Sequence, residues 1–136
     1  MKSTEELLKL LENINIEEFK KEEAFQSIDF PAYLNEVLSQ HGLQPKDVIV
    51  KLNMERSYTY QILNGRRNPT RNFLIRIAFL CKLSIDETQK LLSAGNRPIL
   101  YPRNRFDAAV LYCIQHQLSE EELNELLKDI EEEALF

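Results

Sequence analysis

The chain has 136 residues, 43% of them hydrophobic and 29% charged, which is the composition of an ordinary globular protein long enough to bury a sizeable core. No uncharged apolar run approaches the roughly 20 residues of a membrane-spanning helix, and the acidic N-terminus is unlike a signal peptide, so we expect a cytoplasmic protein. The net charge of −5 is unevenly spread, because residues 1–29 hold 4 basic and 8 acidic groups, residues 30–100 hold 10 and 5, and residues 101–136 hold 3 and 9.

The first 29 residues are predicted to be an acidic helical arm. Ser3 with Glu6 three positions later matches a capping box, and leucines at helical spacing follow, so we predict a helix over 4–14. A second amphipathic pattern predicts a helix over 16–27. The apolar residues of this arm either pack on the neighbouring domain or dock a protein partner or a second subunit, and the pattern leaves both alternatives open.

Residues 30–97 carry stronger helical patterns and are predicted to form the main domain. One helix begins at Phe30 and closes at His41-Gly42, a second runs from Pro45 to Leu52, and a third covers 55–64. Thr70 suits the cap of a fourth helix, which carries apolar residues as far as Cys81. Nothing in this region indicates a strand.

A fifth helix of this domain starts at a second capping box, Ser84 with Glu87, and ends at Ala94-Gly95. A proline-bounded connector follows, and residues 98–136 are predicted to add a helical hairpin, with helices over 104–117 and 119–130, packed on or extending the domain. The predicted fold is therefore all-α. Its parts are the arm at 1–29, a five-helix domain at 30–97 and the hairpin at 98–136.

Constellations of catalytic or metal-binding residues are weak in this chain. Cys113 and His116 have a spacing that suits two metal ligands, but a structural zinc site needs four, and only Cys81 and His41 remain as ordinary partners. The chain has no glycine-rich phosphate loop, and no motif supports a catalytic triad. We expect no metal, no cofactor and no enzymatic activity, and we expect both cysteines to be buried free thiols.

The charge pattern indicates a basic surface on the central domain. Between residues 56 and 85 the chain carries five arginines and one lysine and no Asp or Glu, although the whole chain is acidic. Leu63-Asn64-Gly65 is a strong helix stop inside this basic stretch, because glycine adopts positive φ without penalty and Pro69 follows. Such a local concentration of positive charge is typical of a face that binds nucleic acid.

Two helices inside the domain have the spacing of a helix-turn-helix unit, since about three residues separate the helix ending near Leu52 from the one beginning near Arg56. The stretch VIVKLNMERSYTYQILNG (48–65), followed by Arg-Arg-Asn-Pro and the Ile77-Ala78 pair, resembles the lambda-repressor-like, Xre-type helix-turn-helix family. The resemblance covers residues 30–95. In this chain Glu55 stands where the family usually has a Ser or Thr cap, and Ile49 stands where it usually has a small Ala.

The resemblance implies a cytoplasmic transcriptional regulator, repressor-like, that binds double-stranded DNA in a sequence-specific manner and often as a homodimer. The residues that it places against bases are Arg56, Ser57, Tyr60 and Gln61. The residues that it places against phosphates are Asn64, Arg66, Arg67, Thr70 and Arg71. The alternative function is a protein-interaction adaptor or antitoxin-like module that reuses the same fold and binds a protein partner through the acidic flanking helices.

Overall fold

The computed structural model describes residues 3–25 and 28–135, and every regular element within these ranges is helical. The α-helices are α1 Thr4–Asn13, α2 Ile16–Lys21, α3 Phe30–Gln40, α4 Pro45–Leu52, α5 Arg56–Leu63, α6 Arg71–Leu80, α7 Ile85–Ala94, α8 Arg105–Gln115 and α9 Glu120–Asp129. A 3-10 turn, η1 Glu23–Phe25, follows α2. The predicted all-α class is confirmed for the described residues, and each predicted helix is present.

Polar caps begin most of these helices where the sequence places them. The hydroxyls of Ser84 and Ser119 accept hydrogen bonds from the backbone N–H groups three residues later, at 3.1 Å. The carboxylates of Glu87 and Glu122 in turn accept hydrogen bonds from the serine N–H groups, at 3.0 and 3.1 Å. These two capping boxes are confirmed. At Ser3 the structure shows the serine half, a bond of 3.2 Å from the N–H of Glu6. Local chemistry therefore sets where these helices start.

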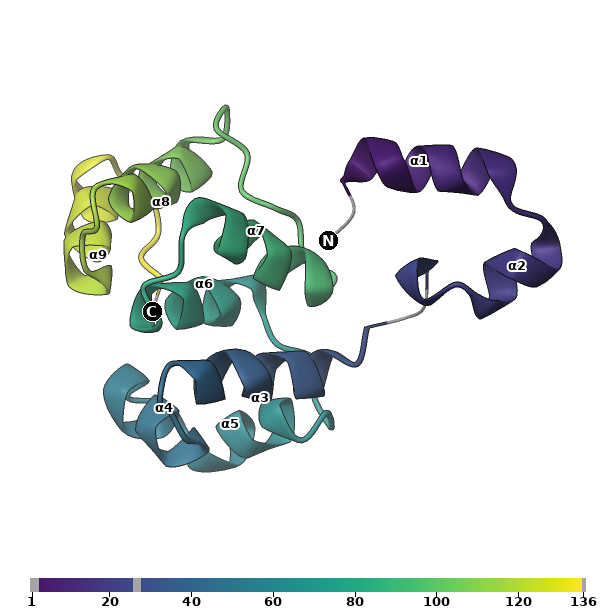
Figure 1. Cartoon of the computed structure of the whole chain (residues 1–136). Coiled ribbons are helices and arrows are strands. Elements are labelled where there is room, and N and C mark those ends of the chain that lie inside the picture. Colours follow the sequence, from purple (N-terminus) through teal and green to yellow (C-terminus); the bar gives the residue numbers. More distant parts are fainter. Residues whose placement is uncertain (1–2, 26–27, 136) are drawn as a thin grey trace.

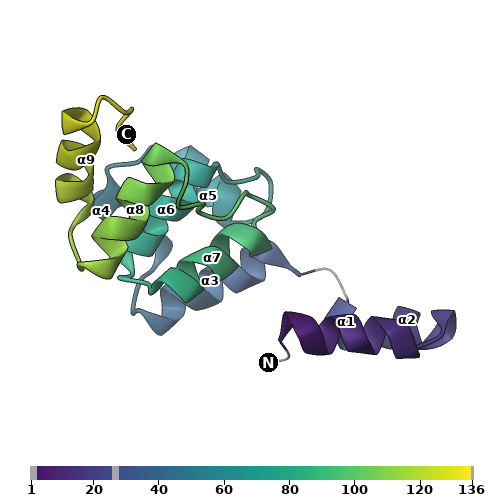
Figure 2. The same ribbon diagram turned by 90° about the horizontal axis from the view of Figure 1, so that it is seen from above.

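Helix α6 is the centre of the fold. All six residues 73–78 of this ten-residue helix are buried, and it packs against α4, α7 and α9. A single apolar core surrounds it, which explains why helices far apart in the sequence meet (Figures 1 and 2). Fully buried members of this core include Leu34, Leu38, Val48, Ile62, Leu74, Ile77, Leu91, Val110, Leu123 and Leu127. Each such side chain stabilises the fold by about 1.5–3 kcal/mol through its burial.

The C-terminal hairpin shares this core. Helix α9 packs on α8 and α6, α8 packs on α7, and the chain returns so that Leu135 is buried and its N–H donates to Asn124 Oδ1 at 2.8 Å. The two views show α8 and α9 lying along the end of the five-helix group from α3 to α7 (Figures 1 and 2). No helix among the described residues is long and apolar enough to cross a membrane.

The acidic arm does not pack on the neighbouring domain, which was the first of the two alternatives for its apolar residues. Neither α1 nor α2 contains a buried residue, and both stand apart from the other helices in the two views (Figures 1 and 2). The ring of Phe19 stacks instead on Phe25 within the arm, at 5.5 Å between centroids. Packing of the arm on the domain is therefore wrong as a prediction. The predicted second helix ends at Lys21, with η1 beyond it, and residues 26 and 27 lie outside the described part of the chain.

Both cysteines are buried free thiols, as predicted. Burial, with a smaller contribution from the nearby carboxylate of Glu87, raises the pKa of the Cys81 thiol to about 11. Burial likewise raises the pKa of the Cys113 thiol. Both thiols therefore remain protonated at neutral pH, and the nucleophilic thiolate form is disfavoured.

Candidate nucleic-acid interface

Helices α4 and α5 pack against each other across a turn of three residues, 53–55. Asn53 makes this turn because it adopts the left-handed conformation, with φ 50° and ψ 51°, which asparagine tolerates better than most side chains. The N–H of Met54 then returns to the carbonyl of Ile49 at 3.0 Å and closes the end of α4. Ile49 itself is half-buried, so the larger side chain at this position is accommodated beside the core.

Glu55 caps the start of α5 with its carboxylate. Its two oxygens accept the N–H groups of Ser57 at 2.9 Å and Tyr58 at 2.6 Å. A negative charge at a helix N-terminus is favourable because the unpaired N–H groups there carry partial positive charge. The acid that replaces the usual Ser or Thr therefore performs the capping role, and its oxygens bond to the helix start.

Helix α5 divides into an inner and an outer face. Thr59, Ile62 and Leu63 are buried, and the Thr59 hydroxyl donates to the carbonyl of Glu55 at 2.9 Å. The predicted base-contacting residues occupy the other side, where Arg56, Ser57 and Tyr60 are exposed and Gln61 is half-buried. The Arg56 guanidinium lies over the Tyr60 ring, 5.4 Å from its centroid. These two side chains therefore form one exposed unit at the start and middle of the outer face.

The turn after α5 presents two arginines to solvent. The backbone N–H groups of Arg66 and Arg67 both donate to the carbonyl of Gln61, at 2.9 and 3.1 Å, and Arg66 N–H also lies 3.2 Å from Asn64 Oδ1. The Arg67 guanidinium sits over the Tyr58 ring at 5.2 Å. Asn64, Arg66 and Arg67 are all exposed. The structure thus brings these predicted phosphate-contacting residues together beside the outer face of α5.

Two further residues hold this turn against α3, and sequence reasoning missed one of them. Gly65 has φ +84°, and a Cβ atom at this position would approach Pro31 Cγ to 3.0 Å, so glycine is required by both conformation and space. Asn35 was not predicted to matter. Its side-chain amide donates to the carbonyls of Pro31 at 2.8 Å and Leu63 at 2.9 Å, which ties the end of α5 to α3.

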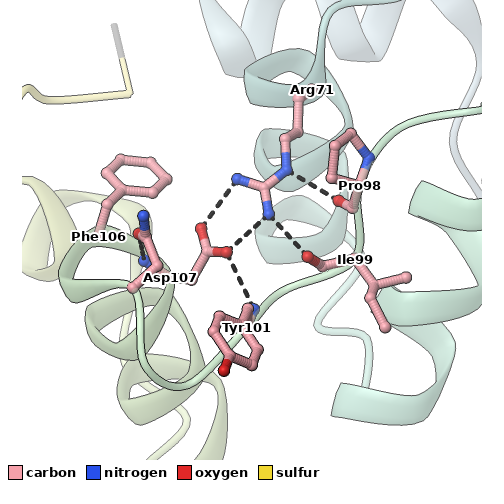
Figure 3. Close-up of a pocket in the computed structure, with 7 residues that line it drawn as sticks. Arg71, Pro98, Ile99, Tyr101, Phe106 and Asp107 are labelled. Carbon is pink, nitrogen blue, oxygen red and sulfur yellow. Dashed lines mark hydrogen bonds and ion pairs between the residues drawn. The ribbon is translucent and has the colours of Figure 1, made fainter.

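Thr70 and Arg71, the last two predicted phosphate contacts, have structural roles at the start of α6. The Thr70 hydroxyl caps the helix by accepting the N–H of Phe73 at 3.1 Å. The Arg71 guanidinium makes a two-pronged ion pair with Asp107, at 2.8 and 2.9 Å, and also donates to the carbonyls of Pro98 and Ile99 (Figure 3). Four of its five N–H donors are thereby engaged within the protein.

Arg76 belongs to the basic stretch of the sequence but lies inside the fold. Its guanidinium pairs with Glu120 at 2.6 Å and donates to the carbonyl of Leu52 at 2.6 Å, and the residue is 9% exposed. It therefore connects the end of α4 to α6 and α9. A signal for this role was present, because Arg76 interrupts the otherwise apolar run FLIRIAFL, where a charge must find a buried partner.

The outer face of α5 and the following turn together form a largely exposed surface, which we call the reading face. It consists of Arg56, Ser57, Tyr60, Gln61, Asn64, Arg66 and Arg67. Its three arginines have no acidic partner, because the ion pairs among the described residues join Lys20 to Glu17, Arg71 to Asp107 and Arg76 to Glu120. Comparisons with protein-family models, with curated proteins and with solved structures found no match to this chain.

Proposed function

We propose that this protein is a lambda-repressor-like, Xre-type helix-turn-helix regulator that binds duplex DNA and reads its sequence with α5 in the major groove. The observation that supports this most directly is the reading face, an unpaired basic surface on the second helix of a pair joined by a three-residue turn. In helix-turn-helix proteins the corresponding helix enters the groove with its N-terminal residues against base edges. Exposed Arg56 and Ser57 are the first two residues of α5.

The side chains of the reading face have the donors that direct readout requires. The Arg56 guanidinium matches the O6 and N7 acceptors of guanine, and the Gln61 amide matches the N6 and N7 groups of adenine. Stacking on Tyr60 limits the conformations of Arg56 before DNA arrives, so less entropy is lost on binding. We assign Arg56, Ser57, Tyr60 and Gln61 to base contacts.

We assign phosphate binding to the turn after α5. Arg66 and Arg67 place two positive charges beside the reading helix, and Asn64 and the capped start of α6 at Thr70 offer uncharged donors. Arg71 is left out of this set, because its guanidinium already holds Asp107 and two backbone carbonyls. Glu55 opposes DNA less than its charge suggests, since its carboxylate is bonded to the helix N-terminus.

Selection from random double-stranded oligonucleotides, with the purified full chain at physiological salt, tests the proposal. We expect enrichment of one sequence class, and inverted repeats with half-site centres about one helical turn apart would identify binding as a dimer. No enrichment, together with no retention of duplex DNA at low salt, would refute DNA binding.

Two substitutions distinguish base readout from charge attraction in a binding titration. Arg56→Ala should cost about 1–3 kcal/mol and relax the preference at one base position. Arg67→Ala should weaken all sequences alike and reduce the salt slope by about one unit. Lys90→Ala is the charge-matched control, because Lys90 is equally exposed but lies on α7, beside α3 and α6. Equal effects of all three changes would contradict the assignment of the reading face.

The exposed arm favours a second candidate function, a protein-interaction module that reuses the same fold. Leu8 is 56% and Leu11 is 42% exposed on α1, and neither touches the core. Leu8→Glu with Leu11→Glu separates the two functions, because a DNA-binding regulator keeps its preference for the same half-site sequence whether or not the arm contacts another molecule. An adaptor would instead lose its main partner and show no selected site in either form.

A further inference from the structure

Exposed large hydrophobic residues are concentrated on the arm. Of the ten in the described part of the chain, five fall between residues 8 and 28, at Leu8, Leu11, Ile16, Phe19 and Ile28. These five side chains are 42–73% exposed and lie on α1, on α2 and on the segment that follows them. Large apolar side chains left uncovered on helices with no buried residue indicate a contact with another molecule.

The arm is also too short to be stable without such a contact. Helix α1 has ten residues and α2 has six, whereas isolated helices below roughly 12–15 residues are marginal in water. The caps at Ser3 and Asn15 help to start both helices, but each cap contributes only about 1 kcal/mol. Packing of Leu8 and Leu11, which we call the leucine face of α1, against another molecule would supply the missing stabilisation.

A surface of complementary character lies at the connector between α7 and α8. An open pocket of about 400 Å³ is lined there by Ile99, Tyr101 and Phe106, with the Arg71–Asp107 ion pair between them (Figure 3). Ile99 is 53% and Tyr101 is 56% exposed. The pocket therefore offers apolar side chains of its own that the fold leaves uncovered.

The charge beside this pocket is opposite to that of the arm. Arg103 and Arg105 are exposed at the start of α8, and Asp107, the acid that follows them, is paired with Arg71. The arm, in residues 1–29, carries eight acidic and four basic groups. Apolar and electrostatic complementarity therefore both favour the connector pocket as the surface that receives the arm.

We propose that two copies of this chain form a dimer by exchanging arms, with the leucine face of α1 from each copy docked on the connector pocket of the other. A second copy is the occupant because a two-fold axis repeats the same acidic-to-basic contact twice. One short helix on one pocket covers less than a standard interface of roughly 1,600 Å², and two reciprocal contacts double the area that is buried. This dimer goes beyond the proposed function and does not depend on DNA binding.

Sedimentation of the full chain over a concentration series tests the exchange. We expect a species of twice the 16.0 kDa of one chain that dissociates on dilution and at high salt. Leu8→Glu with Leu11→Glu in the arm, or Ile99→Glu with Tyr101→Glu in the pocket, should each weaken dimerisation at least tenfold. All four positions are exposed, so the helical domain keeps its fold, and cooperative urea unfolding of each variant verifies this. Tyr112→Glu, at a site 50% exposed on α8, is the control and should leave the dimer intact.

Mixing the arm variant with the pocket variant gives the decisive result. The pocket variant keeps a wild-type arm, and the arm variant keeps a wild-type pocket. The mixture therefore restores one intact contact, in which the first chain's arm docks on the second chain's pocket. A heterodimer should therefore form at a concentration where each variant alone is monomeric. A wild-type chain that stays monomeric at every concentration would overturn the proposal. A pocket variant that dimerises like wild type would also overturn the proposal, because it would indicate that the arms pair with each other. A mixture of the two variants that fails to associate would overturn it as well.

Discussion

The buried ion pair of Arg76 and Glu120 should control the stability of the whole helical domain. The two side chains are 10% and 16% exposed and lie 2.6 Å apart, and Arg76 also bonds to the carbonyl that ends α4. Replacing Glu120 by Ala removes this carboxylate from a guanidinium that is mostly buried. Because Arg76 contacts both α4 and α9, the loss should destabilise the hairpin and the reading face together.

The magnitude follows from the separation and burial of the pair. Charges with centres roughly 4 Å apart interact by about 4 kcal/mol at an effective dielectric constant near 20. Removing one partner of a buried pair costs about 3–5 kcal/mol. Water reaches the partly exposed carboxylate and lowers the cost, so we expect Glu120→Ala to reduce the free energy of unfolding by about 3 kcal/mol. Replacing both residues by Met should cost much less, because no buried charge then remains.

Equilibrium urea unfolding at neutral pH, followed by circular dichroism at 0.1 and 1 M NaCl, measures these changes. Glu121→Ala is the matched control, since Glu121 is the adjacent acid in the same helix turn but is exposed. We expect the control to change stability by less than about 0.5 kcal/mol. The cost at Glu120 should persist at high salt, because buried pairs are screened little. Equal costs at the two glutamates would refute this account of the pair.

Three further predictions concern the turn after α5, the helix caps and the thiols. Gly65→Ala should reduce the free energy of unfolding in urea by about 1–3 kcal/mol, because φ is +84° and the new Cβ meets Pro31 at 3.0 Å. Gly42→Ala is the control for the conformational cost alone, because Gly42 has φ +69° and nothing lies within 4 Å of the new Cβ. Equal losses of stability in the two variants would exclude a contribution from the Pro31 contact. Ser119→Ala should cost about 1 kcal/mol by breaking a capping box, whereas Ser93→Ala on exposed α7 surface should cost little. Stability should fall as pH rises above 9.0, because the Cys81 thiol then ionises in the unfolded chain but keeps its proton in the folded one up to a pKa of about 11. From pH 8 to 11 the Tm of Cys81→Ala should decline less steeply than that of the wild-type chain. The same decline in both proteins would contradict this assignment.

The reading face shows how far local sequence could predict the site. The resemblance to the helix-turn-helix family assigned Arg56, Ser57 and Tyr60 to one side of α5, and they are exposed there. The same resemblance assigned Arg71 to phosphate. Its partner, Asp107, lies 36 residues later, and no local pattern reports which acid a given arginine meets.

The sequence by itself determined the helices, because caps, glycine stops and apolar spacing act within a few residues. For example, Ser84 and Ser119 cap the starts of α7 and α9, and Gly65 adopts positive φ in the turn after α5. Only the tertiary structure decided which arginines are free, because ion pairing depends on which helices the core brings together. Burial of α6 draws Arg76 inward to Glu120, while the arm, whose apolar face finds no place on the same chain, is left exposed. Local interactions thus specify the elements, and long-range packing specifies the charges and apolar surfaces that remain available to a partner.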